Sequence, residues 1–215
     1  MPTLEFNLVK NISIGENVCY KENSMFNAFR GCANFNSPIT IPNGVTNIAH
    51  TFYGCSNFNQ PITIPNGVTN ISRMFSSCNN FNQPITIPAS VANLAYAFYS
   101  CSKFNQPITI PNSVTDLSYT FHNCPNLSGN IYIYSNNVQN ICNFIASRNN
   151  SRQINIFAYY GSETYNRFLH GNYYSTSSTG IRYNNCFILG TNGITWTSSG
   201  TQWFNTKYNV YLLRL

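Results

Sequence analysis

The stretch FNQPITIPNSVTDLSYTFHNC, from Phe104 to Cys124, occurs several times in the chain in slightly altered form. One period of 23 residues earlier the sequence is FNQPITIPASVANLAYAFYSC, and one period before that it is FNQPITIPNGVTNISRMFSSC. A fixed period of this length is the signature of a solenoid. Each unit is too small to bury its own apolar side, so it stacks on its neighbours.

Four residue types recur at fixed places in the unit. The recurring positions are Phe29, Phe52, Phe75, Phe98 and Phe121; Cys32, Cys55, Cys78, Cys101 and Cys124; Ile41, Ile64, Ile87, Ile110 and Ile133; and Val45, Val68, Val91 and Val114. The period holds until Val138, which comes one residue late. We expect these side chains to form one continuous core along the stacked units.

The segment PITIP within each unit alternates apolar and polar residues and is bounded by prolines, which predicts a short strand. Its isoleucines are expected to point inward and its threonine outward. Successive outward residues then form a ladder with rungs about 4.8 Å apart. This ladder is the candidate ligand-binding surface, and its five rungs are Thr40, Thr63, Thr86, Thr109 and Tyr132.

The rest of the unit is expected to supply turns and corners. NGV or NSV forms a turn, and VTNI forms a second extended segment with its Val and Ile inward. The Phe-x-x-Cys segment forms a tight corner that places both side chains in the core. There the cysteine sulfur can make weak hydrogen bonds to backbone groups of the adjacent loop.

The segment AFYSCSKFNQPITIPNSVTDL resembles the BspA-type leucine-rich repeat, over about residues 20–145. Phe35, Phe58, Phe81 and Phe104 stand where that family usually has leucine, and Leu127 restores it. The resemblance implies a curved solenoid with a binding surface and no enzymatic activity. Related repeats occur in bacterial surface adhesins and in bacteriophage proteins. We therefore expect a mostly β protein: a leucine-rich-repeat solenoid with 23-residue repeats, followed by a small C-terminal β-rich module.

Composition divides the chain into three expected regions. Residues 1–24 are a degenerate capping coil, residues 25–154 are the solenoid, and residues 155–215 are an aromatic, basic module with strand-like segments such as GITWTSS and YNVYLLRL. Residues 141–215 hold six Lys or Arg side chains against Glu163 alone, a balance of +5. Aromatic and Arg residues are enriched at interfaces, although aromatic residues also fill the cores of small β domains. The candidate attachment residues are Tyr159, Tyr160, Arg167, Tyr173, Tyr174, Arg182, Trp196 and Trp203.

The sequence offers little support for catalysis or metal binding. Its eight cysteines form no Cys-x-x-Cys pair, and His50, His122 and His170 lack metal-ligand spacing, so no metal site and no cofactor are expected. Five carboxylates in 215 residues give no convincing acid–base pair, so we do not expect an enzyme. Buried, reduced thiols are favoured, and disulfides between adjacent units stay open as an alternative.

Charge and hydropathy limit the partners. Charged residues make up 7% of the chain, and 36 asparagines help to replace them. Arg30, Arg73 and Lys103 occupy three different positions in the repeat, so no basic stripe and no nucleic-acid partner are expected. No apolar segment has the length of a signal peptide or a membrane span, so membrane insertion is not expected.

These observations lead to an expected function. We expect a non-enzymatic binding or structural protein of a bacteriophage particle, on the tail, fibre or capsid exterior, that attaches to a host surface or glycan. The alternatives are a bacterial BspA-like surface adhesin and a purely structural virion decoration protein. The expected partners are virion proteins or further copies of the chain, together with a host-surface glycan or protein. The expected location is the virion, after synthesis in the host cytoplasm, or the bacterial cell surface.

Overall fold

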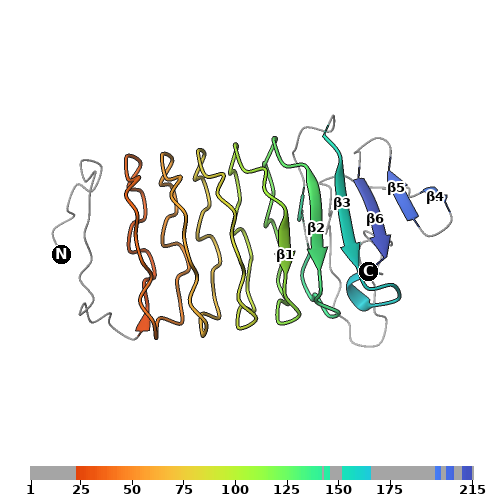
Figure 1. Ribbon diagram of the computed structural model, residues 1–215, viewed down its shortest axis with the longest axis horizontal. Helices are drawn as coiled ribbons and strands as arrows, with labels where there is room; N and C mark the ends of the chain where they lie inside the picture. Colours follow the sequence, from red (N-terminus) through yellow and green to blue (C-terminus); the bar gives the residue numbers. More distant parts are fainter. Residues whose placement is uncertain are drawn as a thin grey trace, which may run out of the picture.

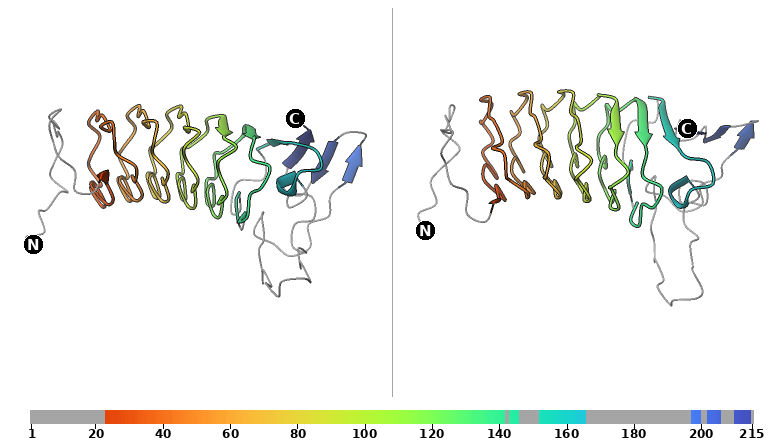
Figure 2. Two further views of the ribbon diagram at one scale, coloured as in Figure 1. Left: turned by 90° about the horizontal axis from the view of Figure 1, so that it is seen from below. Right: turned by 60° about the horizontal axis from the view of Figure 1, so that its bottom comes forward.

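A computed structural model describes residues 23–141, 143–145, 152–165, 197–199, 202–205 and 210–214. Successive coils lie side by side along the long axis (Figure 1), and the same stacking is visible from two further directions (Figure 2). Parallel bridges join equivalent residues of neighbouring coils: Ser24–Asn47, Asn47–Asn70, Asn70–Asn93, Asn93–Asp116 and Asp116–Asn140. The last interval is one residue longer, as the late position of Val138 predicts. The solenoid is confirmed.

Within the described part of the chain, six strands form one sheet at the C-terminal end of the solenoid. They are β1 (Ile108–Ile110), β2 (Gly129–Ile133), β3 (Ile154–Ala158), β4 (Thr197–Ser199), β5 (Gln202–Asn205) and β6 (Val210–Arg214), in the spatial order β1-β2-β3-β6-β5-β4. The first four of that order pair in parallel, and β6, β5 and β4 pair antiparallel. Ile108, Ile131, Ile156 and Leu212 form one buried row across it.

Prolines bound the PITIP segments and limit β1 to three residues. The segment 108–110 is a regular strand, but 39–41, 62–64 and 85–87 are not, although each has its threonine exposed and its second isoleucine buried. Pro107 and Pro111 flank β1, and proline has no N–H to donate to a ladder. Strands β2 and β3 contain no proline and pair over five residues. The PITIP strand prediction is therefore confirmed for one of these four coils.

Phenylalanine rings form the centre of the core in two stacked columns. In one coil the ring centroids of Phe75 and Phe81 lie 4.2 Å apart, and Phe75 lies 5.8 Å from Phe52 of the preceding coil. These rings are nearly parallel and fully buried, a favourable arrangement when the rings are offset. Within the described residues, the column of Phe81 ends at Phe104, which Leu127 follows in the next coil. The column of Phe75 ends where Phe144 meets Phe121 edge to face at 5.3 Å. The expected burial of the repeated Phe, Cys, Ile and Val positions is confirmed.

Asparagine ladders hold the coils together at the surface. Asn82 Oδ1 accepts hydrogen bonds from the backbone N–H of Asn105 at 2.8 Å and from Nε2 of Gln106 at 3.2 Å. Asn36, Asn59 and Asn105 accept the equivalent backbone bond from the following coil. A neutral amide both donates and accepts, whereas like charges facing each other across strands are destabilising. The stacking geometry therefore explains why asparagine is abundant and charge is scarce.

The corner of each coil contains two left-handed positions. The first is occupied by Asn27, His50, Arg73, Tyr96 and Tyr119, whose φ angles lie between 54° and 60°. The second holds Gly31, Gly54, Ser77, Ser100 and Asn123. At the same corner Cys55, Cys78, Cys101 and Cys124 each donate to a phenylalanine carbonyl of the preceding coil at 2.9–3.0 Å. These four cysteines and Cys32 are buried and free, and the expected sulfur hydrogen bonds are confirmed.

The expected regional boundaries remain predictions. Residues 1–22, almost the whole expected capping coil, lie outside the described residues. The expected boundary between residues 154 and 155 falls within β3, which pairs with β2 on one side and β6 on the other. The GITWTSS and YNVYLLRL segments contain β4 and β6, respectively. One sheet thus extends from the solenoid into the C-terminal region.

Candidate functional site

The predicted ladder lies on the surface of the solenoid. Thr40, Thr63, Thr86 and Thr109 are exposed, and they follow one another at the same place in successive coils. Strand register places Thr109 opposite Tyr132, and Tyr132 opposite Phe157. Tyr132 is partly buried because its ring stacks on Phe157 with centroids 4.7 Å apart. The ladder therefore continues beyond its five predicted rungs.

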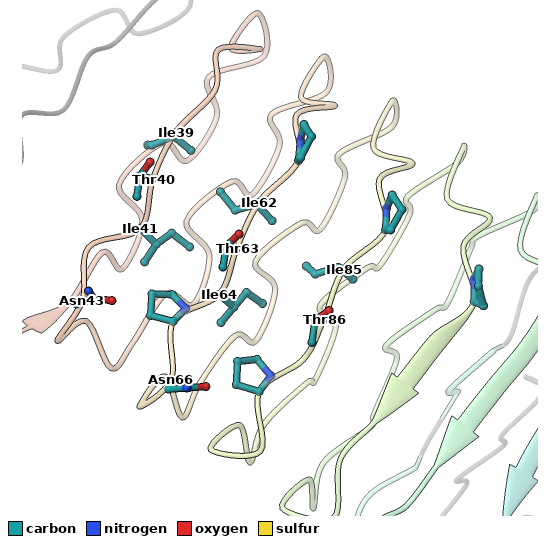
Figure 3. Close-up of a pocket in the computed structure, with 15 residues that line it drawn as sticks. Ile39, Thr40, Ile41, Asn43, Ile62, Thr63, Ile64, Asn66, Ile85 and Thr86 are labelled. Carbon is teal, nitrogen blue, oxygen red and sulfur yellow. The ribbon is translucent and has the colours of Figure 1, made fainter.

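A groove of about 790 Å³ runs over the first three rungs. We call it the threonine groove and define it by Thr40, Thr63 and Thr86, which lie on successive coils (Figure 3). Isoleucine and proline side chains form its apolar walls, and asparagines lie at its turn end. None of its lining residues is charged. The groove thus offers hydroxyl groups at regular intervals on an apolar floor.

Tyrosines gather where the ladder reaches β2 and β3. Tyr134 and Tyr159 are 39% and 41% exposed, and their rings meet edge to face at 6.0 Å. Tyr160 is 61% exposed and contacts Tyr165 edge to face. Two of the candidate attachment residues, Tyr159 and Tyr160, therefore follow the strand that carries Phe157, the rung beyond Tyr132.

The structure describes only one of the other six candidate attachment residues. The backbone of Trp203 lies in β5, opposite Leu212 of β6. Arg167, Tyr173, Tyr174, Arg182 and Trp196 lie outside the described residues. Their role in attachment stays a prediction.

The described residues contain no group of three His, Cys, Asp or Glu side chains arranged to hold a metal ion. In the same part of the chain, no helix is both long and apolar enough to cross a membrane. The chemistry that the threonine groove itself offers is hydrogen bonding by hydroxyls and contact with apolar side chains.

Comparison with known proteins gives a family. The family model described as "Mycoplasma protein of unknown function, DUF285" matches residues 23–132 and 65–157, which together make up more than half of the chain. The chain belongs to the DUF285 family. No curated protein and no solved structure matches this DUF285 chain. Its asparagine and phenylalanine ladders are consistent with coils of leucine-rich-repeat type.

The coils of this DUF285 chain also carry a cluster that the sequence analysis missed. Arg30 and Arg73 occupy different positions of the repeat, so the sequence pattern did not group them. Within one repeat unit, however, these two positions are only three residues apart and lie at the same corner. The Arg30 guanidinium lies 5.0 Å from the Tyr53 ring centroid, and that of Arg73 lies 4.3 Å from Tyr96. The His50 ring stacks on Tyr53. Combining positions three residues apart in the corner would have revealed this cluster.

Proposed function

We propose that this chain is a non-enzymatic binding protein whose threonine groove holds an extended, uncharged ligand, specifically a neutral glycan. The observation that carries the proposal is the uncharged groove of about 790 Å³ along three coils. A repeated floor suits a repeated ligand, because each coil offers the same hydroxyl and the same apolar walls. The BspA-type resemblance agrees with a binding role.

The chemistry of the groove favours a glycan over a charged ligand. Threonine hydroxyls donate and accept hydrogen bonds, as sugar hydroxyls do. The walls of Ile62, Pro61 and Pro65 offer apolar contact to the C–H faces of a sugar. Exposed Tyr134 and Tyr159 lie near the other end of the ladder and add aromatic surface. Each contact is weak, so useful affinity requires many contacts or many copies.

We place this activity on a bacterial cell surface, which was an alternative in the sequence analysis. The family description names Mycoplasma, a bacterium, and a bacterial source agrees with a cell-surface protein. The virion location rests on the resemblance to bacteriophage proteins and on the neutral, polar composition with its aromatic, basic C-terminal end. Fractionation of the source cells, with detection by an antibody to the chain, distinguishes the two, because a virion protein would sediment with purified particles.

The binding test uses neutral and acidic oligosaccharides immobilised on an array. We expect the full chain to bind a subset of neutral glycans with little change between low and moderate salt. The double substitution Thr63→Glu and Thr86→Glu puts carboxylates into the groove, and we expect it to weaken that binding at least about tenfold, which is about 1.4 kcal/mol.

Matched substitutions provide the control. Thr46 and Thr69 are exposed threonines that follow the turn in two of the same coils and do not line the groove. We expect Thr46→Glu with Thr69→Glu to bind neutral glycans as the unsubstituted chain does. Full binding by the groove variant, or equal loss in both variants, would refute the proposed site.

A further inference from the structure

The outward side of the corner carries a second surface, which we call the corner stripe: Arg30, His50, Tyr53, Arg73, Tyr96 and Tyr119. Arg30 is exposed and the other five residues are partly exposed. His50 and Tyr53 fall midway along the chain between Thr40 and Thr63, and no residue of the corner stripe lines the threonine groove. The two surfaces can therefore be altered independently.

Backbone geometry fixes the spacing of the cations. His50 and Arg73 occupy the same left-handed position in neighbouring coils, and each N–H donates to the next coil at 2.9 Å. The Arg30 guanidinium lies over the Tyr53 ring, and the Tyr53 ring stacks on that of His50 with centroids 5.8 Å apart. Arg30, His50 and Arg73 thus lie on three consecutive coils, with the imidazole in the middle.

No carboxylate neutralises this cluster within the described residues. The acidic side chains there are Asp116 and Glu163, and Asp116 accepts hydrogen bonds from Ser118. Burial, followed by the charges of Arg73 and Arg30, lowers the pKa of His50 below its usual value of 6.5. The imidazole therefore lies in a positive field that an anion would relieve.

The orientation of His50 leaves one nitrogen for a ligand. Its Nδ1 is buried without a hydrogen-bond partner, so Nε2 is the ring nitrogen that can reach a bound group. Guanidinium groups bind carboxylate, sulfate and phosphate oxygens with fixed geometry, and an imidazole N–H adds a further donor.

The tyrosines limit the kind of polymer that carries the anion. Tyr96 and Tyr119 stack face to face at 4.5 Å with an interplanar angle of 6°, and Arg73 covers Tyr96. Both faces of Tyr96 and one face of Tyr119 are therefore covered, which leaves little room for nucleic-acid bases, since these bind single-strand sites by stacking on aromatic faces. Phenolic hydroxyls can instead bind the hydroxyl groups of a sugar.

We propose that Arg30, His50 and Arg73 bind an oxyanion group of an acidic polysaccharide, while the hydroxyls of Tyr96 and Tyr119 contact the adjoining sugars. This site uses different residues and a different ligand class from the threonine groove.

Dextran sulfate, with uncharged dextran as its control, tests the site on the full chain. We expect dextran sulfate to bind and to weaken at least tenfold when salt rises from 50 to about 200 mM, as phosphate contacts do in nucleic-acid complexes. Arg30→Gln with Arg73→Gln should weaken binding at least tenfold, whereas Lys103→Gln, an exposed cation outside the stripe, should change it less than about twofold. Circular dichroism checks that each variant is folded.

Inorganic sulfate and NMR provide a second measurement that needs no substitution. Bound sulfate should raise the pKa of His50, because it counters the two arginines, and should move that of His122 less, since Arg30 and Arg73 do not contribute to its shift. Equal shifts at both histidines would overturn the proposal. So would unchanged dextran sulfate binding in the double arginine variant, or tighter binding of oligo-thymidine DNA than of dextran sulfate. If the full chain binds dextran sulfate through the corner stripe but binds no neutral glycan, only the threonine-groove proposal is refuted.

Discussion

The sulfur of Cys78 donates a hydrogen bond to the backbone carbonyl oxygen of Phe52 at 3.0 Å, across the boundary between two coils. Both residues are fully buried. The same bond recurs at three further corners, so the thiols connect coils as donors and would lose this role if they were ionised or alkylated. Burial raises the pKa of Cys55 and of Cys124 to about 12.

The first prediction concerns thiol reactivity. Cys55, Cys78, Cys101 and Cys124 should resist iodoacetamide in the native protein at pH 8, because the thiolate is the reactive form and these thiols stay protonated. Mass spectrometry of peptides from native and urea-unfolded samples measures the labelling of each residue. Rapid native labelling of Cys78 would contradict its burial.

The second prediction concerns alkaline pH. The pKa of these thiols is higher in the folded protein than their ordinary value of 9.0, so their stabilising contribution is complete below pH 9 and declines as pH rises toward 12. In that window each thiol can lower the free energy of unfolding by up to about 1.4 kcal/mol per pH unit. Urea denaturation between pH 8 and 10.5 should show stability falling. Cys78→Ala should lower the starting stability and make the decline shallower; an unchanged slope would count against the linkage.

The third prediction concerns the phenylalanine columns. Phe75→Ala removes a ring that contacts Phe52, Phe81 and Phe98, and the cavity should cost about 3–5 kcal/mol of unfolding free energy. Phe26, which is 51% exposed, supplies the matched control, and its replacement by alanine should cost less than about 1 kcal/mol. Equal costs in urea denaturation would mean that the columns are not the core.

Much of this core could be predicted from the sequence because its residues recur at a fixed period. Contacts between residues that do not share a repeat position could not be predicted. Phe75 and Cys78 recur at a fixed period, and stacked coils require equivalent side chains to face inward. The pairing of β6 with β3 could not be predicted, because about 50 residues without the repeat separate Val210 from Ala158. The Arg73–Tyr96 contact was missed because a repeat pattern aligns equivalent positions and does not indicate which different positions share a corner.

The fourth prediction uses a natural variation in the bridge ladder. Asn70 Oδ1 accepts the N–H of Ser72 at 2.9 Å, and Asp116 makes the equivalent bond to Ser118. Asn70→Ala should cost about 1 kcal/mol because it removes this bond. Asn70→Asp should be closer to neutral in thermal denaturation at pH 7, as the aspartate retains the acceptor. A larger loss for aspartate than for alanine would contradict this explanation.

The fifth prediction concerns backbone strain at the second left-handed position. Ser77 has φ of 62° where Gly31 and Gly54 stand in earlier coils. Ser77→Gly should stabilise the protein by up to about 1 kcal/mol, because left-handed backbone costs residues with a Cβ roughly that amount. Its neighbour Ser76 is buried and has no left-handed φ, so Ser76→Gly should destabilise by about 0.5–1 kcal/mol. Chemical denaturation of the two variants gives the comparison, and the same sign for both would disprove it.

The asparagine ladders have a consequence for how such a protein can change over generations. The backbone N–H of Asn59 donates to Asn36 Oδ1 of the preceding coil, and Asn59 Oδ1 accepts the same kind of bond from the N–H of Asn82 in the next coil. Duplicating or deleting one whole coding unit would therefore rebuild these ladder bonds at the new junction, whereas losing a few residues would shift the register and break them. The solenoid can thus gain or lose whole coils without a change of fold. Recombination between repeats of the same gene would therefore lengthen or shorten the binding surface.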